Sequence, residues 1–285
     1  VKTALRVSLF GGGTDFPEFF NKNKANVIGF TINKYIHNIA IQTIYDEDYR
    51  IRLSYRRNEE VIELSEIKHP LYREILSKYN PKGSWHFLSV TDVPSGTGLG
   101  SSSSFAVGLL RLIRKISNLD YSNDSNIGKE AINFERNILN EAGGWQDQIH
   151  AAFGGINSIE FLGNDFKVSP INLANHSLQL LNDSMYLVYT GITRNASAIE
   201  LSKTHISKND YLMRMVEIAN EGEKLFTETQ LNLEDIGSLL GEGWKLKKLL
   251  SDNVSDSDLD YMYDSILSSG AYGAKLCGAG GGGFF

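Results

Sequence analysis

Residues 94–104 read Pro-Ser-Gly-Thr-Gly-Leu-Gly-Ser-Ser-Ser-Ser and lie between an apolar segment, residues 85–90, and a segment with helical periodicity. Glycines let backbone N–H groups turn inward and approach an anion closely. A helix that begins near Ser102 adds the positive end of its dipole and its free N–H groups. The stretch therefore predicts a phosphate-binding loop; a flexible linker that ends in an N-cap serine is the structural alternative.

This loop is not a Walker P-loop, because that motif requires Lys-Ser or Lys-Thr directly after its last glycine. Here Gly100 is followed by Ser101. Backbone amides and serine hydroxyls, rather than a lysine, are therefore expected to bind the phosphates, and a hydroxyl is also a possible magnesium ligand.

Two further glycine clusters lie near the ends of the chain. Gly11-Gly12-Gly13 follows an apolar strand, and Asp15 behind it is predicted to be an exposed acid that accepts hydrogen bonds from polyol hydroxyls. Residues 278–283 contain G-x-G-x-x-G, but a dinucleotide fingerprint needs a helix directly after it and an acid about 20 residues on. Since Phe284-Phe285 is typical of a strand, we expect a loop that a substrate or nucleotide approaches closely, with a plain tight turn as the alternative.

Two acids and one arginine are candidates for phosphoryl-transfer chemistry, which needs a metal ligand, a group that orients the attacking hydroxyl and cations near the phosphate. Glu135 and Asp147 lie on successive predicted helices joined by the Gly143-Gly144 turn, so they can converge on one pocket. A solvated surface acid is the alternative for Asp147. Arg6 lies within an apolar strand and needs a partner if it is buried, unless it is an edge-strand arginine.

Composition limits the function classes. The 285 residues include 28 basic and 34 acidic side chains, for a net charge of −6, which argues against bulk nucleic-acid or anionic-membrane binding. The single cysteine, Cys277, excludes an intramolecular disulfide and fits a reducing compartment, so a cytoplasmic location is expected. The sequence contains no run of about 18 apolar residues, so it predicts no membrane-spanning helix.

Hydrophobic residues make up 41% of the chain, enough for a sizeable core, and its length is typical of about two domains. Strands and helices mix without strict alternation, which predicts an α+β fold. We expect an ATP-phosphate-binding and catalytic domain over residues 1–164 and a C-terminal domain over residues 165–285. Because a glycine-rich turn runs into Phe284-Phe285, we also expect a last strand and helix beyond this sequence. Predicted strands are residues 5–10, 27–30, 35–44, 51–55, 85–90, 156–161, 185–189 and 274–277, and predicted helices are 70–79, from 103, 127–140, 145–153, 196–204, 211–226, 233–250 and 258–267.

Three segments resemble the three motifs of the GHMP small-molecule kinases, a family that includes galactokinase, homoserine kinase and mevalonate kinase. They are Arg6 to Phe16, Pro94 to Ser104 and Cys277 to Gly283. The resemblance implies an N-terminal ribosomal-protein-S5-like domain and a C-terminal ferredoxin-like domain. Gly11 to Glu18 also resembles the bacterial heptose kinase branch, as do Gln146-Asp147-Gln148 and Thr190 to Arg194. That branch phosphorylates D-glycero-D-manno-heptose 7-phosphate at the anomeric hydroxyl, on the way to GDP-heptose; L-fucokinase-type enzymes are near neighbours.

The resemblance also implies residue roles. Asp147 accepts or orients the sugar hydroxyl proton, and Arg6 stabilises charge beside it. Glu135 and Ser103 hold Mg²⁺. Galactokinase has a glutamate and a histidine where Gly12 and Gly13 stand, which disfavours galactose. The expected ATP-binding residues are Pro94, Gly96, Gly98, Leu99, Gly100, Ser101, Ser102 and Ser103, and the expected sugar-binding residues are Gly12, Gly13, Thr14, Asp15, Gly280 and Gly281.

A phosphorylated sugar has a dianionic end that requires a cation at a fixed distance from the reacting hydroxyl. Arg194 is the candidate, and a surface arginine that caps the next helix is the alternative. An ATP-dependent sugar kinase is the favoured hypothesis. A nucleotide-binding sensor without catalysis and a dinucleotide-dependent oxidoreductase compete with it, and the oligomeric state stays open.

Overall fold

A seven-stranded sheet forms the centre of the protein in a computed structural model that describes residues 1–44, 48–193, 209–228 and 230–285. Six strands follow the order β4-β3-β5-β2-β6-β7, and β1 pairs with β2. The pairing of β3 with β5 is parallel and the other pairings are antiparallel. The strands are β1 (Lys2–Phe10), β2 (Ala25–Thr43), β3 (Ile51–Ser54), β4 (Asn58–Val61), β5 (Ser84–Thr91), β6 (Ile156–Leu162) and β7 (Asp165–Pro170).

The long strand β2 corrects the prediction of two separate strands over residues 27–30 and 35–44. Its partners change along its length: β6 pairs with residues 25–30, β1 with residues 28–37 and β5 with residues 36–43. The register of β1 against β2 shifts between Ala4 and Arg6, so the extra residues around Asn33 form an irregularity within one strand. The polar residues that predict a turn locally are thus held in the sheet by three neighbouring strands.

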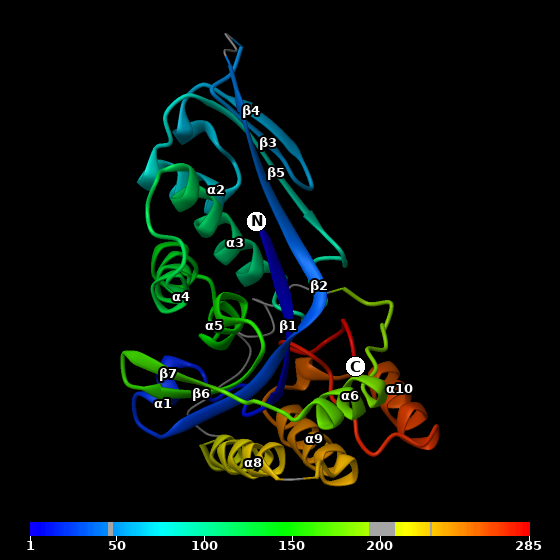
Figure 1. The fold of residues 1–285 in the computed structure, drawn as a ribbon. Coiled ribbons are helices and arrows are strands. Elements are labelled where there is room, and N and C mark those ends of the chain that lie inside the picture. The colour runs from blue at the N-terminus through cyan, green and yellow to red at the C-terminus, as the bar shows by residue number, and fades with distance from the viewer. Residues whose placement is uncertain (45–47, 194–208, 229) are drawn as a thin grey trace.

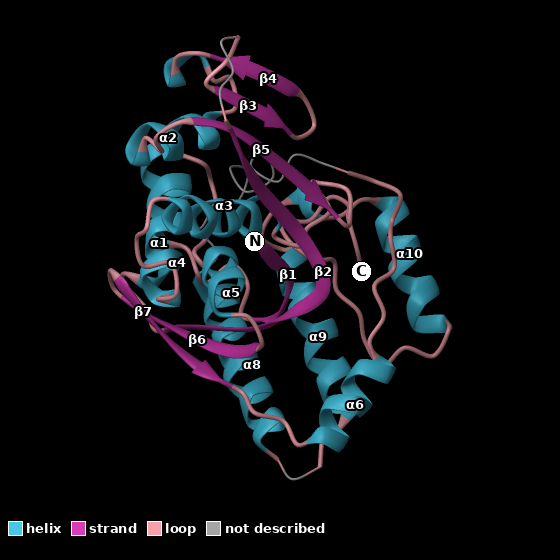
Figure 2. Cartoon of the chain, turned by 45° about the horizontal axis from the view of Figure 1, so that its top comes forward, coloured by secondary structure: helices cyan, strands magenta, loops and turns pink. Residues whose placement is uncertain are grey.

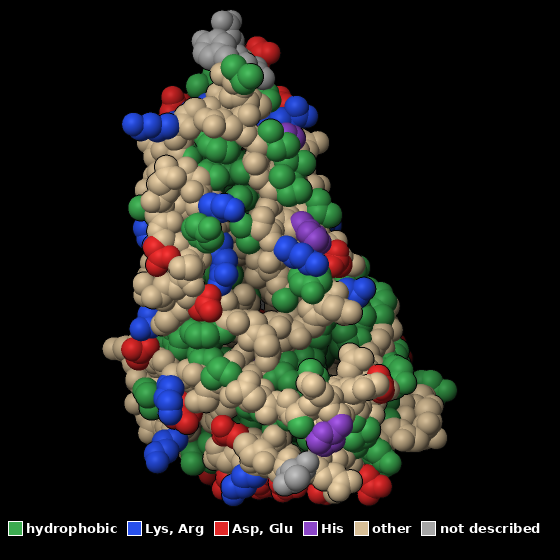
Figure 3. All heavy atoms as spheres, viewed as in Figure 1, with side chains coloured by type: hydrophobic (Ala, Val, Ile, Leu, Met, Phe, Trp, Pro, Cys, Tyr) green, Lys and Arg blue, Asp and Glu red, His purple; other side chains and the backbone are tan. Residues whose placement is uncertain are grey.

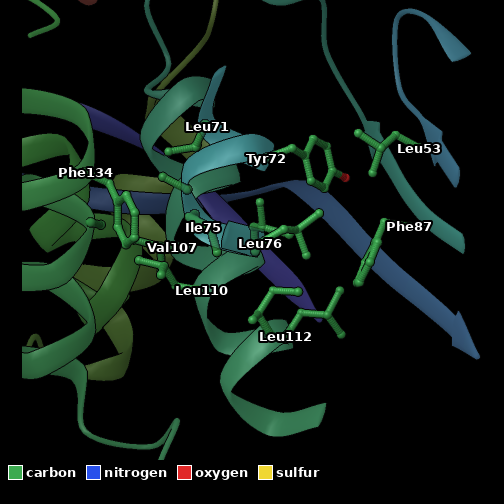
Figure 4. Packing of buried hydrophobic residues seen from close by; sticks show 14 of the residues in the cluster. Leu53, Leu71, Tyr72, Ile75, Leu76, Phe87, Val107, Leu110, Leu112 and Phe134 are labelled. Atoms are coloured by element: carbon green, nitrogen blue, oxygen red, sulfur yellow. The ribbon is translucent and has the colours of Figure 1, made fainter. Parts of the chain in front are cut away.

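Four helices cover one face of the sheet, as Figure 1 and Figure 2 show: α2 (Pro70–Tyr79), α3 (Ser101–Ile116), α4 (Asp124–Ile132) and α5 (Gln146–Phe153). Figure 4 shows Tyr72 of α2 beside Leu53 and Phe87 of the sheet, and Leu110 of α3 on the other side of the same apolar cluster, near Phe134. The apolar stripe predicted for α3 is confirmed at Leu109, Leu112 and Ile113, which are buried.

The helix predicted over residues 127–140 is divided. After α4, residues Asn133–Ile138 form a π-helical segment, η2, in which Leu139 donates its N–H to the carbonyl of Phe134. Single π-turns are rare and concentrate at functional sites. This one contains the buried Glu135.

The second half of the described chain is mostly helical, with α6 (Asn175–Ser184), α8 (Asn209–Thr227), α9 (Leu233–Lys248) and α10 (Ser257–Ser268). Helix α8 packs on β1 and β2, where Phe10 and Phe226 have ring centroids 6.4 Å apart. The remaining short helices are α1 (Pro17–Phe20), η1 (Leu64–Glu66) and η3 (Asp252–Val254). The sequence did not predict α6, and the predicted helix at 196–204 lies outside the described residues.

The strands predicted at 185–189 and 274–277 are wrong as continuous elements. Among the described residues, the pairing there is one bridge between Tyr189 and Phe284, with hydrogen bonds from Val188 to Phe285 and from Cys277 to Phe284. A pairing of one or two residues leaves most backbone groups outside a ladder, so these segments are extended without forming strands.

The overall architecture is the predicted mixture of α and β, built on a mainly antiparallel sheet. The boundary expected at 164/165 falls inside the hairpin of β6 and β7, so β7 continues the N-terminal sheet. The division into two domains otherwise stays a prediction. Within the described ranges, no helix is both long and apolar enough to cross a membrane. The face drawn in Figure 3 carries basic and acidic side chains interspersed, without a continuous basic patch.

Candidate active site

A cavity of about 580 Å³ lies where the three glycine clusters meet. The first cluster contributes Gly12 and Gly13, the second contributes residues on both sides of Leu99, and the third contributes Gly278 and Ala279. These segments are far apart in the sequence, so the cavity exists only in the folded chain. Its lining from the second cluster is Ser95, Gly96, Gly98, Gly100, Ser101 and Ser102.

The third glycine cluster packs backbone to backbone on the second. A Cβ atom on Gly98 would lie 2.5 Å from the carbonyl oxygen of Cys277, and one on Gly283 would lie 2.3 Å from that of Thr97. Such distances exclude any side chain, and Gly98 also has a φ of +79°. No helix follows these glycines before Phe285, so the segment lacks the context of a dinucleotide fingerprint.

Helix α3 starts at Ser101 with Gly100 as its N-cap, at a φ of +71°. Among the described residues no side chain caps its first turn, so the first N–H groups stay free at the end of this 16-residue helix that borders the cavity. This arrangement is a ready-made anion site. It supports the phosphate-binding interpretation over the linker alternative, because Gly100, Ser101 and Ser102 all border the cavity.

Arg6 and Asp147 form a two-hydrogen-bond ion pair at the cavity wall. Arg6 projects from β1 toward Asp147, which lies in the first turn of α5. Arg6 Nε donates to Asp147 Oδ1 at 2.8 Å, and Arg6 Nη2 donates to Asp147 Oδ2 at 2.6 Å. Its Nη1 donates to the carbonyl of Gly98 at 2.6 Å, and its backbone N–H to that of Leu99 at 3.1 Å. One arginine therefore joins the second motif to the helix that carries Asp147.

Both members of the pair are charged. Burial by itself raises the pKa of Asp147, but the charge and hydrogen bonds of Arg6 lower that pKa below its ordinary value overall. Burial likewise acts to lower the pKa of Arg6, and Asp147 raises it above the usual range. Arg6 is 4% exposed and Asp147 is 23% exposed, so the arginine is fixed inside the wall and the carboxylate reaches the cavity.

Glu135 reaches the same cavity from η2. Its Oε2 accepts hydrogen bonds from Ser103 Oγ at 2.8 Å and from Gln148 Nε2 at 2.6 Å. Burial raises the pKa of Glu135 to about 7. Within the described residues there is no cluster of three or more His, Cys, Asp and Glu side chains that could hold a metal ion.

Asp15 is not the exposed acid that its sequence context predicts. It is 1% exposed, and it accepts backbone N–H groups from Gly13 on Oδ1 at 3.0 Å and from Gln146 on Oδ2 at 3.1 Å. The carboxylate borders the cavity but chiefly joins the first glycine cluster to the start of α5. Thr14 is also buried, outside the cavity lining, and donates to the carbonyl of Gly11 at 2.8 Å.

Several other predicted residues lie just outside the lining. Leu99 is buried in the core and presents only its carbonyl to Arg6, and Ser103 faces Glu135. Gly281 donates its N–H to the carbonyl of Val254 at 2.8 Å, and a Cβ on Gly280 would lie 2.8 Å from the same oxygen. Pro94 is likewise absent from the lining, and Arg194 lies outside the described residues.

Other lining residues carry no local sequence signal. The cavity is also bordered by Tyr55, His69 and Phe105, and the ring centroid of His69 lies 4.9 Å from that of Tyr55 and 5.4 Å from that of Phe105. Lys247 of α9 donates to the carbonyls of Leu276 at 2.9 Å and Gly278 at 2.5 Å and brings a cation to the third cluster. In the sequence this lysine is one of several on an amphipathic helix, and only packing distinguishes it.

Family models match both halves of the chain. The model of the GHMP kinases N terminal domain matches residues 67–155, and that of the GHMP kinases C terminal matches residues 225–285.

Individual relatives agree with these matches. A D-glycero-alpha-D-manno-heptose 7-phosphate kinase of Campylobacter jejuni is 34% identical over 99% of this chain and 87% of its own length. A bifunctional fucokinase/GDP-fucose pyrophosphorylase of Arabidopsis thaliana is 30% identical over 68% of this chain and 19% of its own. The crystal structure of a D-glycero-D-manno-heptose 1-phosphate kinase from Bacteriodes thetaiotaomicron superposes with a TM-score of 0.79 at 25% identity, over 99% of this chain and 85% of that one.

Proposed function

Because the chain belongs to the GHMP kinase family, whose members use ATP, we propose that it phosphorylates the anomeric hydroxyl of D-glycero-D-manno-heptose 7-phosphate. The product is the 1,7-bisphosphate. One observation carries the proposal: the Arg6–Asp147 pair borders the same cavity as the uncapped start of α3. A phosphate donor site and an acceptor-orienting carboxylate are thereby adjacent.

The ATP phosphates would bind the N–H groups at the start of α3 and the hydroxyls of Ser101 and Ser102. These donors need no lysine, because the helix end and the loop backbone together favour negative charge. The adenine base would occupy the end of the cavity beside Tyr55, His69 and Phe105, where apolar ring surface is available for packing against it.

Asp147 is suited to orienting the acceptor hydroxyl rather than to removing its proton. Arg6 holds the pKa of Asp147 low, so the carboxylate is ionised at neutral pH and accepts a hydrogen bond well but is a weak base. Phosphoryl transfer depends mainly on positioning and on electrostatic stabilisation, and both are available here. Arg6 fixes the carboxylate and supplies positive charge to the wall.

Mg²⁺ fits the oxygen donors of Glu135 and Ser103. Mg²⁺ prefers oxygen ligands and is commonly held by one or two carboxylates together with substrate phosphates, so a single glutamate and a hydroxyl are enough. When bound, the ion neutralises charge on the transferring phosphate. Gln148 holds the Glu135 carboxylate in place from the opposite helix.

A phosphorylated acceptor is supported by cations on the cavity wall. Lys247 and Lys275 lie at the third glycine cluster, and Arg136 lies at the turn before α5, where it donates to the carbonyl of Gly144 at 3.2 Å. Any of these can face the distal phosphate of a heptose phosphate. An L-fucokinase-like sugar 1-kinase is the second candidate, because a fucokinase is among the relatives. A cytoplasmic location stays a prediction.

A coupled ADP-release assay over a panel of D-glycero-D-manno-heptose 7-phosphate, L-fucose, D-mannose and D-galactose tests the proposal. We expect the highest kcat/KM on the heptose phosphate. A higher kcat/KM on L-fucose would assign L-fucose as the substrate in place of the heptose phosphate. ATP binding without turnover of any sugar would favour the sensor hypothesis. Thermal protection by ATP but not by NAD is expected, and the reverse would favour an oxidoreductase.

A further inference from the structure

Two buried side chains border the cavity beside Asp147, and each has a polar atom without a hydrogen-bond partner in the described part of the chain. Ser8 is 6% exposed and Gln146 is 9% exposed. The unpartnered atoms are the hydroxyl oxygen of Ser8 and Oε1 of Gln146. A buried polar atom without a hydrogen bond destabilises the folded chain, so a partner from outside the fold is expected for each of them.

The fold places these two groups next to the reacting pair. Ser8 follows Arg6 by two positions in a regular part of β1, so both side chains lie on one face of the strand. Gln146 directly precedes Asp147, and its backbone N–H is fixed by Asp15 Oδ2 at 3.1 Å. A ligand group that contacts Asp147 therefore has Ser8 and Gln146 as its immediate surroundings.

Gly12 provides the space between them. A Cβ atom on Gly12 would lie 3.1 Å from Ser8 Oγ and 3.6 Å from Gln146 Nε2. The φ of Gly12 is not positive, in contrast to Gly11 and Gly13, so its backbone does not require glycine. The missing side chain instead keeps both polar groups open to the cavity.

Neighbouring buried polar atoms do not compete for this role. Gln148 Oε1 and both ring nitrogens of His150 also have no partner among the described residues, but neither side chain borders the cavity. His69 Nδ1 is also unpartnered among the described residues and His69 borders the cavity, but its ring packs with Tyr55 and Phe105. Ser8 and Gln146 are thus the unpartnered pair on the segments that carry Arg6 and Asp147. Serine and glutamine can each both donate and accept, which matches a hydroxyl group better than a phosphate, a carboxylate or a methyl group.

We propose that Ser8 and Gln146 bind the sugar hydroxyl adjacent to the one that Asp147 orients. In a kinase that acts on the anomeric hydroxyl, this adjacent group is the 2-hydroxyl of the sugar. The assignment rests on the proposed function and names the specificity determinant of that same site. A site built to bond a hydroxyl rejects an analogue without it, because the buried protein groups then stay unpaired.

The test compares D-glycero-D-manno-heptose 7-phosphate with its 2-deoxy analogue, for the wild type, Ser8→Ala and Gln146→Met. The wild type should prefer the full substrate by at least about 10-fold in kcat/KM. Each variant should lose about 10- to 100-fold on the full substrate and less than 3-fold on the 2-deoxy analogue, with KM for ATP unchanged. Equal losses on both substrates, or an unchanged preference in both variants, would overturn the assignment.

Thermal unfolding separates this role from a structural one. Ser8→Ala removes no bond within the fold, so its Tm should match that of the wild type. Ser158→Ala is the matched control, because buried Ser158 donates to Asn26 Oδ1 at 3.0 Å, and its Tm should fall. An equal fall for Ser8→Ala would show that Ser8 is bonded internally and would also overturn the assignment.

Calorimetric binding of the two sugars, with a non-hydrolysable ATP analogue present, keeps the assignment distinguishable from the proposed function. A wild type that binds the full sugar at least about 10-fold more tightly than the 2-deoxy sugar, without turning it over, refutes the kinase activity and keeps the binding role. Equal affinities refute the binding role, whether or not turnover occurs. If L-fucose is the preferred substrate, 2-deoxy-L-fucose replaces the heptose analogue in the same comparison.

Discussion

Replacing Asp147 by asparagine tests the ion pair at the centre of the site. The substitution keeps the shape of the side chain but removes its charge. Arg6 then keeps the Gly98 carbonyl as a partner, at 2.6 Å, and its two other donors face an amide that offers a single, uncharged acceptor oxygen. A double variant, Arg6→Met with Asp147→Leu, removes both charges and is the matched control.

The expected magnitudes follow from burial. Breaking a fully buried ion pair by removing one partner costs about 3–5 kcal/mol, because a buried charge is left unpaired. Asp147 is 23% exposed, so we expect a loss of about 2–3 kcal/mol in the free energy of unfolding for Asp147→Asn. The double variant leaves no unpaired charge and should lie within about 1.5 kcal/mol of the wild type, the loss coming from the unpaired Gly98 carbonyl.

Urea unfolding and ADP release are measured on the same preparations. Turnover should fall at least about 100-fold in Asp147→Asn and in the double variant, and also in Asp147→Ala, while ATP still binds. The two measurements together separate the structural role of the ion pair from its role in turnover, because the double variant should recover stability without recovering activity. Wild-type stability in Asp147→Asn would refute the closed pair, and wild-type turnover in any of these variants would remove Asp147 from the chemistry.

Three further outcomes are expected. Burial lowers the pKa of His150 from 6.5 to about 3, so the unfolded chain binds one more proton than the folded chain as the pH falls. The wild type should therefore lose about 2 kcal/mol of unfolding free energy between pH 7 and pH 5 through this residue, and His150→Phe should lose less. Equal pH profiles of urea unfolding for the two proteins would contradict this prediction. Gly98→Ala should destabilise the fold by more than about 2 kcal/mol and raise KM for ATP, because the new Cβ would lie 2.5 Å from the Cys277 carbonyl oxygen. Gly163→Ala is the control, because Gly163 has open space around it and its variant should show only the strain of a positive φ. Similar unfolding midpoints for the two variants would count against the packing of the second glycine cluster on the third. Glu135→Gln should raise the Mg²⁺ concentration that gives half-maximal turnover by about 10-fold or more, with no loss of Tm. An unchanged Mg²⁺ titration would exclude Glu135 as a ligand.

Local chemistry explains what could be predicted about the helices and the loop. The period of apolar residues specifies α2, α3, α8, α9 and α10, because one stripe of each must be buried. The glycines and serines of residues 94–104 predict an anion site, because backbone N–H groups and a helix end lie within a few residues of one another.

Features that depend on partners far away in the sequence could not be predicted in this way. Asp15 has the sequence context of an exposed acid. Its bond from the Gly13 N–H is local, but the N–H of Gln146 reaches it only after α5 packs beside the first glycine cluster. The same holds for β2, which three strands keep continuous through the polar residues near Asn33.

The sequence by itself determined which residues are chemically suited to phosphate binding and to orienting a hydroxyl, since charge, glycine content and helix starts are local properties. Only the tertiary structure decided that Arg6 meets Asp147 across 141 positions. It also decided that Ser8 Oγ and Gln146 Oε1 lie at the same cavity without a partner among the described residues. The physical reason is that burial and hydrogen-bond satisfaction belong to the packed chain, and no segment carries them alone.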